Sequence, residues 1–159
     1  MFFGKYAVLD SPTYYFEKEP DWYWKFRPAT SVDAIAKARW YDDKSVPATD
    51  ENGEPIKLLP IWFERAIHEL AVLFDGTNIP LDPEKPVEDG GKPILDPKAS
   101  LTEREKVIGG MPPDMLGELW VALGDAVPFW GPLLLAEEDT PQDENENPNP
   151  AEDEAGKQS

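Results

Sequence analysis

The segment WYWKFRPATSVD (residues 22–33) contains the features that decide the fold of this chain. Its aromatic and charged residues alternate, which is the period of a β-strand with one buried face. The two faces would carry Trp22, Trp24 and Phe26 on one side, and Tyr23, Lys25 and Arg27 on the other. Pro28 ends such a strand, and Thr30 followed by Asp33 fits the capping pattern of a helix start. The segment therefore predicts a half-buried strand followed directly by a helix.

Two more aromatic-rich runs precede this strand. They are KYAVL (5–9) and TYYFE (13–17), separated from each other and from the strand by the turn-forming sequences DSP and KEP. Aromatic and β-branched residues favour strands, whereas Pro in the connecting sequences ends them. The N-terminal part is therefore expected to form a small antiparallel β-sheet or hairpin.

Helical patterns dominate the rest of the chain. The helix that starts after Thr30 has a narrow apolar stripe of Val32, Ile35, Ala36 and Trp40, with Lys37 turned elsewhere, which predicts packing against the sheet. Asn52-Gly53 then favours a loose hairpin or a long loop between residues 45 and 58.

The strongest helical pattern is IWFERAIHELAVLF (61–74), with Pro60 before it and Gly76 as its expected stop. One face of this helix would consist of Phe63, Ala66, Ile67, Leu70 and Phe74. Two shorter helices are expected over 100–110 and 114–126. The predicted fold class is α+β, with the small N-terminal sheet packed on a bundle of three to four helices.

The composition divides the chain into regions. Residues 1–136 are expected to form a single small α+β domain, interrupted at 76–99 by a Pro-rich irregular insert that contains a short echo, PLDPEK and ILDPK. Residues 137–159 hold nine carboxylates and one lysine, which gives this segment a charge of -8 out of a total of -17. Because it has little apolar surface to bury, the acidic tail is predicted to be disordered.

Composition also excludes several classes of function. The absence of cysteine rules out disulfides, thiolate metal sites and cysteine nucleophiles. The acidic charge opposes nucleic acid binding, which depends on clustered Lys and Arg. No stretch approaches the roughly 20 apolar residues of a membrane span. We therefore expect a protein that binds neither nucleic acid nor membrane.

The sequence patterns do not indicate a catalytic or metal-binding site. His68, the only histidine, falls on the polar side of its helix with Glu64 and Arg65, which is typical of a surface residue. The tail sequence DENENPNPAEDE (143–154) matches a calcium loop at several positions, but Pro148 replaces the Gly needed for its sharp turn. We assign no catalytic residue, no metal site and no cofactor, and we expect that the protein is not an enzyme.

The layout resembles the tail assembly chaperones of long-tailed bacteriophages: a small domain opening with WKFRPATSVDAIAKAR, a helical body, and an acidic Pro-rich tail. Such proteins bind the long tape measure protein, keep it soluble, and help recruit tail tube subunits. Many exist in a short form and a longer form made by ribosomal frameshifting. The tripeptide Ala155-Gly156-Lys157 is compatible with the codons GCG-GGA-AAG, which contain a slippery heptamer found in such genes. The resemblance thus implies the short form, acting in the host cytoplasm.

The expected partner-binding residues lie in two places. One is the apolar segment PFWGPLLL (128–135), and the other is the outward face of the strand at 22–27. The residues are Phe129, Trp130, Leu133, Leu134 and Leu135 in the first, and Tyr23, Lys25 and Arg27 in the second. Folding of the first segment over the core, and self-association of the chain, are left open.

Two other functions remain as alternatives. An acidic inhibitor or DNA mimic would bind a basic host protein through a dense array of carboxylates. A minor virion structural protein, such as a head-tail adaptor, would be found in purified particles, from which a chaperone would be absent.

Overall fold

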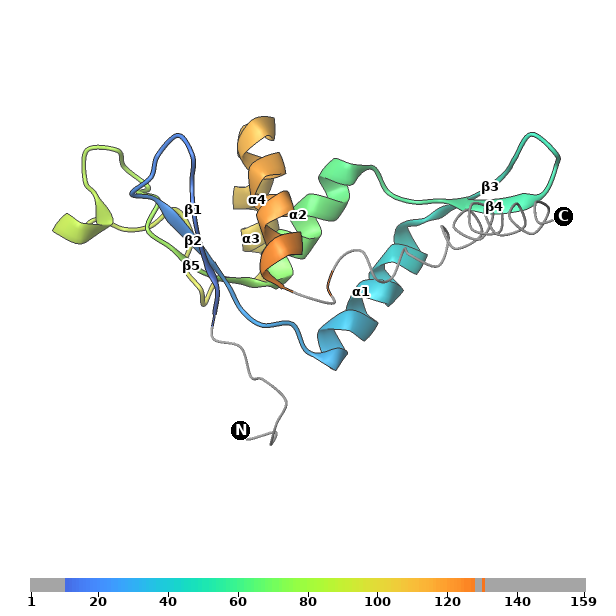
Figure 1. Ribbon diagram of the computed structural model, residues 1–159, viewed down its shortest axis with the longest axis horizontal. Coiled ribbons are helices and arrows are strands. Elements are labelled where there is room, and N and C mark those ends of the chain that lie inside the picture. The colour runs from blue at the N-terminus through green and yellow to red at the C-terminus, as the bar shows by residue number, and fades with distance from the viewer. Residues whose placement is uncertain (1–10, 128–129, 131–159) are drawn as a thin grey trace, which may run out of the picture. The chain divides into compact units, whose positions relative to one another are not determined.

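The computed structural model describes residues 11–127 and Trp130. The chain divides into two units, Met1–Val127 and Pro128–Ser159, and only the first is described over most of its length. The elements of this unit are β1 (Thr13–Tyr15), β2 (Tyr23–Phe26), α1 (Ser31–Lys44), β3 (Val46–Thr49), β4 (Pro55–Leu58), α2 (Trp62–Val72), β5 (Phe74–Thr77), the 3-10 turn η1 (Val87–Asp89), α3 (Leu101–Gly109) and α4 (Pro113–Ala126). Small antiparallel sheets and four helices confirm the predicted α+β class (Figure 1).

The main sheet has the strand order β1-β2-β5, and both pairings are antiparallel. As its alternation predicts, β2 buries Trp24 and Phe26 completely. Trp24 packs against Phe74 of β5 with ring centroids 4.7 Å apart. The predicted strand TYYFE is confirmed as β1, whereas KYAVL lies outside the described residues.

Helices α2, α3 and α4 pack together, with α2 in contact with both of the others. Their buried apolar side chains include Ala66, Leu70, Ile108, Leu116, Leu119 and Leu123. At the edge of the sheet, the Tyr14 hydroxyl donates a hydrogen bond of 2.5 Å to Glu118 of α4. Partial burial and this carboxylate raise the pKa of Tyr14 to about 12. We call the main sheet together with α2, α3 and α4 the body.

The end of α2 differs from the prediction. The helix pattern runs to Phe74, but the helix ends at Val72 and Phe74–Thr77 forms β5. Phe74 and Thr77 pair with Phe26 and Trp24 of β2, so this segment becomes the third strand of the sheet. A local helical preference is weaker than the burial and hydrogen bonding that a long-range pairing provides.

Helix α1 begins as predicted. The Thr30 hydroxyl accepts from the Asp33 amide at 3.3 Å, and the Asp33 carboxylate accepts from the Thr30 amide at 2.8 Å. The predicted orientation of the helix is wrong, however. Val32 is 73% exposed and Ile35 is 52% exposed, whereas Lys37 is the buried residue of this helix. Val32 and Ile35 of the predicted stripe are therefore not packed against the sheet, whereas Trp40, its last member, stacks on His68 of α2.

Strands β3 and β4 form the hairpin that Asn52-Gly53 predicts. Gly53 has φ 81°, in the left-handed region that glycine adopts readily. The hairpin extends from the end of α1 away from the main sheet (Figure 1). We call residues 31–58, which comprise α1 and this hairpin, the arm.

In the described residues, no helix has the length and apolar composition to cross a membrane.

Candidate functional site

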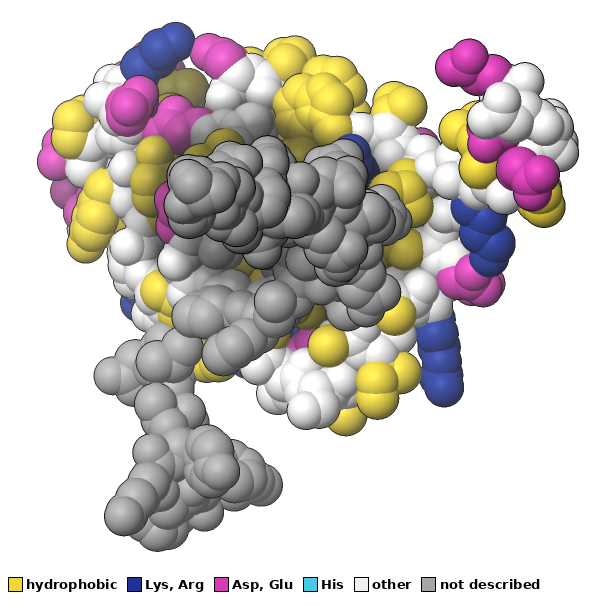
Figure 2. Space-filling view, turned by 45° about the vertical axis from the view of Figure 1, so that its right-hand side comes forward, with side chains coloured by type: hydrophobic (Ala, Val, Ile, Leu, Met, Phe, Trp, Pro, Cys, Tyr) yellow, Lys and Arg dark blue, Asp and Glu magenta, His cyan; other side chains and the backbone are white. Residues whose placement is uncertain are grey.

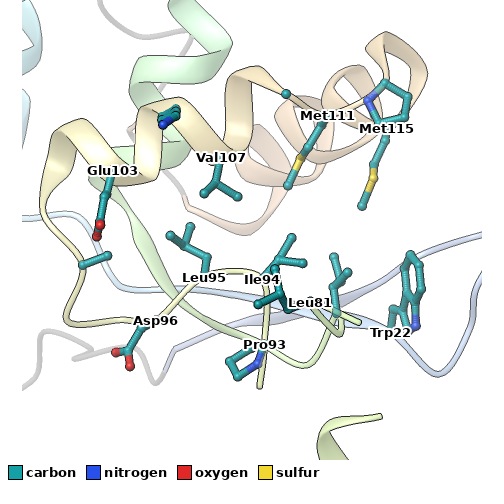
Figure 3. Close-up of a pocket in the computed structure, with 15 residues that line it drawn as sticks. Trp22, Leu81, Pro93, Ile94, Leu95, Asp96, Glu103, Val107, Met111 and Met115 are labelled. Atoms are coloured by element: carbon teal, nitrogen blue, oxygen red, sulfur yellow. The ribbon is translucent and has the colours of Figure 1, made fainter. Parts of the chain in front are cut away.

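An open apolar groove of about 850 Å³ lies between the Pro-rich segment and the helices α3 and α4 (Figure 3). Its size is within the range of ligand and peptide sites in proteins. We call it the groove. Its apolar lining consists mainly of Trp22, Ile79, Leu81, Pro93, Ile94, Leu95, Val107, Met111 and Met115.

One wall of the groove is built by the Pro-rich segment 76–99. Pro80 and Pro93 form an isolated antiparallel bridge, and the Leu81 amide donates to the Lys92 carbonyl at 2.8 Å. Proline lacks the N–H group that a longer ladder requires, so the pairing stops after this bridge. The irregular insert that the sequence predicts is thus ordered on both sides of the bridge, and it presents Leu81 and Ile94 to the groove.

The LDP echo explains the shape of this wall. In the first copy the Asp82 carboxylate accepts from the Glu84 amide at 3.0 Å, and in the second Asp96 accepts from the Lys98 amide at 2.7 Å. Both are turns closed by an aspartate side chain, which Asp followed by Pro favours. The two copies therefore place a turn directly after Leu81 and Leu95, at either side of the wall.

The opposite wall comes from the C-terminal part of α3 and the beginning of α4. Val107 precedes the Gly109-Gly110 stop, and the Met111 amide donates to the Ile108 carbonyl at 3.1 Å. Met111 and Met115 are half-buried and point into the groove from the helical wall (Figure 3). The unbranched, polarisable thioether adapts to irregular apolar surfaces, so this wall suits a variable partner.

Trp22 closes one end of the groove. The buried Asn78 side chain holds its neighbours, since it accepts from the Tyr23 amide at 2.7 Å and donates to the Asp21 carbonyl at 2.8 Å. Trp22 is half-buried and belongs to the buried face in the sequence prediction, but it lines the groove instead of filling the core. Asn78 therefore fixes the backbone on both sides of Trp22.

The other end of the groove carries charge. Asp96 and Glu103 lie together at this end, away from Trp22 and Met115 (Figure 3), and Lys106 also contributes to the lining. The neighbouring Arg104 is engaged elsewhere, because its guanidinium donates to the carbonyls of Ala71 and Pro97 at 3.0 and 2.7 Å. Arg104 therefore fastens the Pro-rich wall to the body, whereas the Asp96 carboxylate points away from the groove (Figure 3).

The arm carries a second exposed apolar surface. In the hairpin register, Val46 lies opposite Leu58 and Ala48 lies opposite Ile56, so all four side chains share one face. Val46 and Leu58 are 57% and 53% exposed. Figure 2 shows such hydrophobic side chains reaching the surface between charged ones. A two-stranded hairpin without a packed face is marginally stable by itself.

The arm meets the body through a buried polar cluster centred on Glu69 of α2. The Lys37 ammonium lies 3.3 Å from Glu69, and both side chains are almost fully buried. Tyr41 donates a hydrogen bond to the same carboxylate, as does Trp120 at 3.3 Å. Burial lowers the pKa of Lys37, and burial together with Glu69 raises the pKa of Tyr41. The cluster therefore joins the arm to the body through contacts of α1 and α4 with one carboxylate of α2.

The prediction that His68 is a surface residue is wrong. It is 8% exposed rather than on the surface, and its ring stacks on Trp40 of α1 with centroids 4.2 Å apart. Its Nδ1 atom lies 3.0 Å from a Glu105 carboxylate oxygen. His68 does lie on the polar side of α2, as the helix wheel indicates. That side is buried because Trp40 of α1 and Glu105 of α3 both contact His68 there. Among the residues that the structure describes, no group of three His, Asp or Glu side chains could hold a metal ion.

The outward face of β2 is partly engaged within the chain. Arg27 makes two hydrogen bonds of 2.8 Å to Asp33, which join the strand to the start of α1. The Lys25 ammonium lies 5.4 Å from the centre of the Tyr23 ring. Of the apolar C-terminal set, Trp130 is buried, and Phe129, Leu133, Leu134 and Leu135 lie outside the described residues.

Comparison with known proteins finds no family model, no curated protein and no solved structure that matches the chain. Its function is therefore inferred from its own sequence and surfaces. The sequence analysis did not predict the groove residues as a binding site, although two signals pointed to them. These signals are the repeated LDP turn and the methionines of GGMPPDM (109–115), where an exposed helix start follows a double glycine.

Proposed function

We propose that this protein is a noncatalytic tail assembly chaperone of a long-tailed bacteriophage, which binds the tape measure protein in the host cytoplasm and keeps it soluble. The single observation that carries the proposal is the open apolar groove with Met111 and Met115 in its wall. Amphipathic helices bind by placing their apolar face in such a groove. The resemblance in sequence layout supplies the tape measure protein as the partner.

The size of the groove suits reversible capture. Each large apolar side chain that a partner buries contributes about 1.5–3 kcal/mol, and association itself costs several kcal/mol. A few such anchors give an affinity from which the partner is released when tail tube subunits arrive. The acidic charge of -17 also favours solubility of the complex and repulsion between copies.

Co-expression with the tape measure protein tests the proposal. Wild-type chain should keep the tape measure protein in the soluble fraction and co-purify with it. The double variant Met111→Asp/Met115→Asp should lose both effects, because a partner's apolar face would meet two unpaired carboxylates. Soluble tape measure protein in the presence of this folded variant would contradict the proposal.

The matched control is Leu101→Asp/Val121→Asp. These two side chains belong to α3 and α4, are 43% and 66% exposed, and do not line the groove. The control adds the same charge to α3 and α4 outside the groove, so it should retain the tape measure protein in the soluble fraction. Urea unfolding of both double variants would show that they are folded.

The segment 128–135 is proposed to add a second contact, through Phe129, Trp130, Leu133, Leu134 and Leu135. A chain truncated after Val127 should capture less tape measure protein than the full chain. Equal capture would show that this segment does not contribute to binding, and the proposed role of the groove would still stand.

Mass spectrometry of purified particles distinguishes the chaperone from a virion adaptor, because only an adaptor would remain in the particle.

A further inference from the structure

The tip of the hairpin holds an asparagine followed by a glycine in an exposed turn. Asn52 and Gly53 are both exposed. Among the described residues, no heavy atom beyond its chain neighbours lies within 4 Å of the position that a Gly53 side chain would take. In the same part of the chain, no hydrogen bond holds the Asn52 side chain. Because glycine has no Cβ, its backbone nitrogen can approach the preceding side chain closely. The Asn52 amide is therefore free to meet the Gly53 nitrogen.

These two groups can react with each other by deamidation. After losing its proton, the Gly53 nitrogen attacks Cγ of Asn52, and a Cγ–N bond forms while the Cγ–Nδ2 bond breaks. The side-chain nitrogen takes up that proton and leaves as ammonia. Water then opens the five-membered imide at one of its two carbonyls, which gives aspartate or isoaspartate. The reaction therefore consumes only water and needs no other reactant.

The closed turn restrains this reaction through Asp50. The Gly53 N–H donates to the Asp50 carbonyl at 3.0 Å. The Asp50 carboxylate accepts from the Asn52 and Glu54 amides at 2.8 and 2.9 Å. A nitrogen whose N–H donates a hydrogen bond gives up its proton less readily, because the hydrogen bond favours the protonated form. The attack therefore requires the turn to open, which exposed loop tips do by local unfolding.

The other asparagines are less suited to the reaction. Asn78 is 9% exposed, and backbone groups hold both ends of its amide. Asn147 and Asn149 precede prolines, which have no N–H, and Asn145 precedes a glutamate, whose side chain hinders the attack. Asn52 is thus the asparagine of this sequence whose following residue leaves the attack unhindered.

We propose that Asn52 is a site of spontaneous deamidation and that the turn closed by Asp50 sets its rate. The inference is independent of the groove. Isoaspartate at position 52 routes the backbone through the former side chain, which adds one methylene to the turn. Turn geometry fixes the register of a hairpin, so the lengthened turn no longer keeps Val46 opposite Leu58. Deamidation therefore disrupts the apolar face of the hairpin.

The test follows the full chain at neutral pH by tandem mass spectrometry of its tryptic peptides. Trypsin cleaves after Lys44 and Lys57, so Asn52 lies in the peptide SVPATDENGEPIK (45–57). Deamidation replaces NH2 by OH in this peptide, and chromatography separates the aspartate form from the isoaspartate form. The modified peptide should accumulate before that of any other asparagine, and β3 and β4 of the modified chain should exchange their amide hydrogens faster. Equally fast modification of Asn78 would overturn the proposal.

The decisive variant is Asp50→Ala. It removes the carboxylate that holds the Asn52 and Glu54 amides, so deamidation should become about tenfold faster, since hydrogen bonds to a charged group keep the turn closed. The matched control Asp43→Ala removes an exposed carboxylate of the same arm outside the turn, and it should leave the rate unchanged. Asn52→Gln should abolish the mass change in peptide 45–57, because its longer side chain must close a six-membered ring.

The remaining outcomes would each contradict one part of the proposal. The synthetic peptide 45–57 supplies the rate for an open turn. Complete conversion of this peptide without conversion of the wild-type chain or of Asp50→Ala would show that Asn52 is not a site in the folded protein. An unchanged or slower rate in Asp50→Ala would show that Asp50 does not protect the turn.

Discussion

The body and the arm use apolar residues in opposite ways. In the body, Leu70 and Leu119 have no solvent exposure, and they lie on helical faces that the sequence pattern marks as apolar. In the arm, Val32 belongs to the apolar stripe predicted for α1 and Leu58 to the apolar face of the hairpin, yet both are more than half exposed, and the residue buried by α1 is Lys37. Periodicity therefore indicates that a surface is apolar without indicating whether the chain itself covers it.

The largest expected effect comes from the cluster that joins the two regions. Replacing Glu69 with Ala removes the carboxylate that Lys37, Tyr41 and Trp120 contact, and it should lower the free energy of unfolding by about 3–5 kcal/mol. Urea denaturation measures this loss. The double variant Lys37→Met/Glu69→Leu removes both charges and should recover most of the stability. A single variant that costs under about 1 kcal/mol would show that the cluster does not hold the arm.

A pair of leucine truncations compares the two regions directly. Leu70→Ala leaves a cavity in the body and should cost about 2–5 kcal/mol of unfolding free energy. Leu58→Ala makes the same chemical change on the exposed face of the hairpin, and it should cost less than about 0.5 kcal/mol. Similar costs for both variants, measured by urea denaturation, would show that the arm is covered in solution.

The pH dependence of stability tests the ion pair between Arg27 and Asp33 at the start of α1. The hydrogen bonds from Arg27 lower the pKa of Asp33 to about 2, from an ordinary value of 3.8. Because the folded-state pKa is depressed, the stabilisation is present above about pH 4 and is lost as the pH falls through about 2. With Arg27 partly exposed, its size should be about 1–2 kcal/mol.

Asp33→Asn is the variant for this measurement. Wild type should be the more stable of the two at pH 7, and the difference should shrink toward pH 2. A difference that is independent of pH would assign the stabilisation to the capping hydrogen bonds of Thr30 instead of the ion pair with Arg27.

The smallest effect should be confined to the hairpin. Gly53 has φ 81°, so Gly53→Ala forces an alanine into the left-handed region at a cost of about 1 kcal/mol. Amide hydrogen exchange in β3 and β4 should accelerate about fivefold, while global unfolding measured in urea stays the same. A matching loss of global stability would show that arm and body unfold as one unit.

Local signals were sufficient for much of the fold. The alternation at 22–26, the Thr30 and Asp33 capping pair and the Asn52-Gly53 turn all correspond to observed features. Each of these depends on residues within a few positions of each other. The strand β5 was missed because its pairing partner β2 lies about 50 residues earlier.

The groove was missed for a similar reason. Its walls come from three separate regions, namely the residue before β2, the Pro-rich segment, and the α3 and α4 pair. The sequence shows the LDP turns and the methionines, but it contains no signal that places Met115 opposite Leu81. The Pro-rich segment is fastened to the body by long-range contacts such as the hydrogen bonds from Arg104 to the carbonyls of Ala71 and Pro97.

The sequence by itself determined the α+β class, the starts of the helices and the chemical character of each surface, because backbone preference and amphipathic period are local properties. Only the tertiary structure decided which apolar surfaces are covered. In WYWKFRPATSVD it buried Trp24 and Phe26, placed Trp22 in the groove, engaged Arg27 with Asp33 and left Val32 exposed. Burial depends on which distant elements meet, and here the buried ion pair between Lys37 and Glu69 joins the arm to the body.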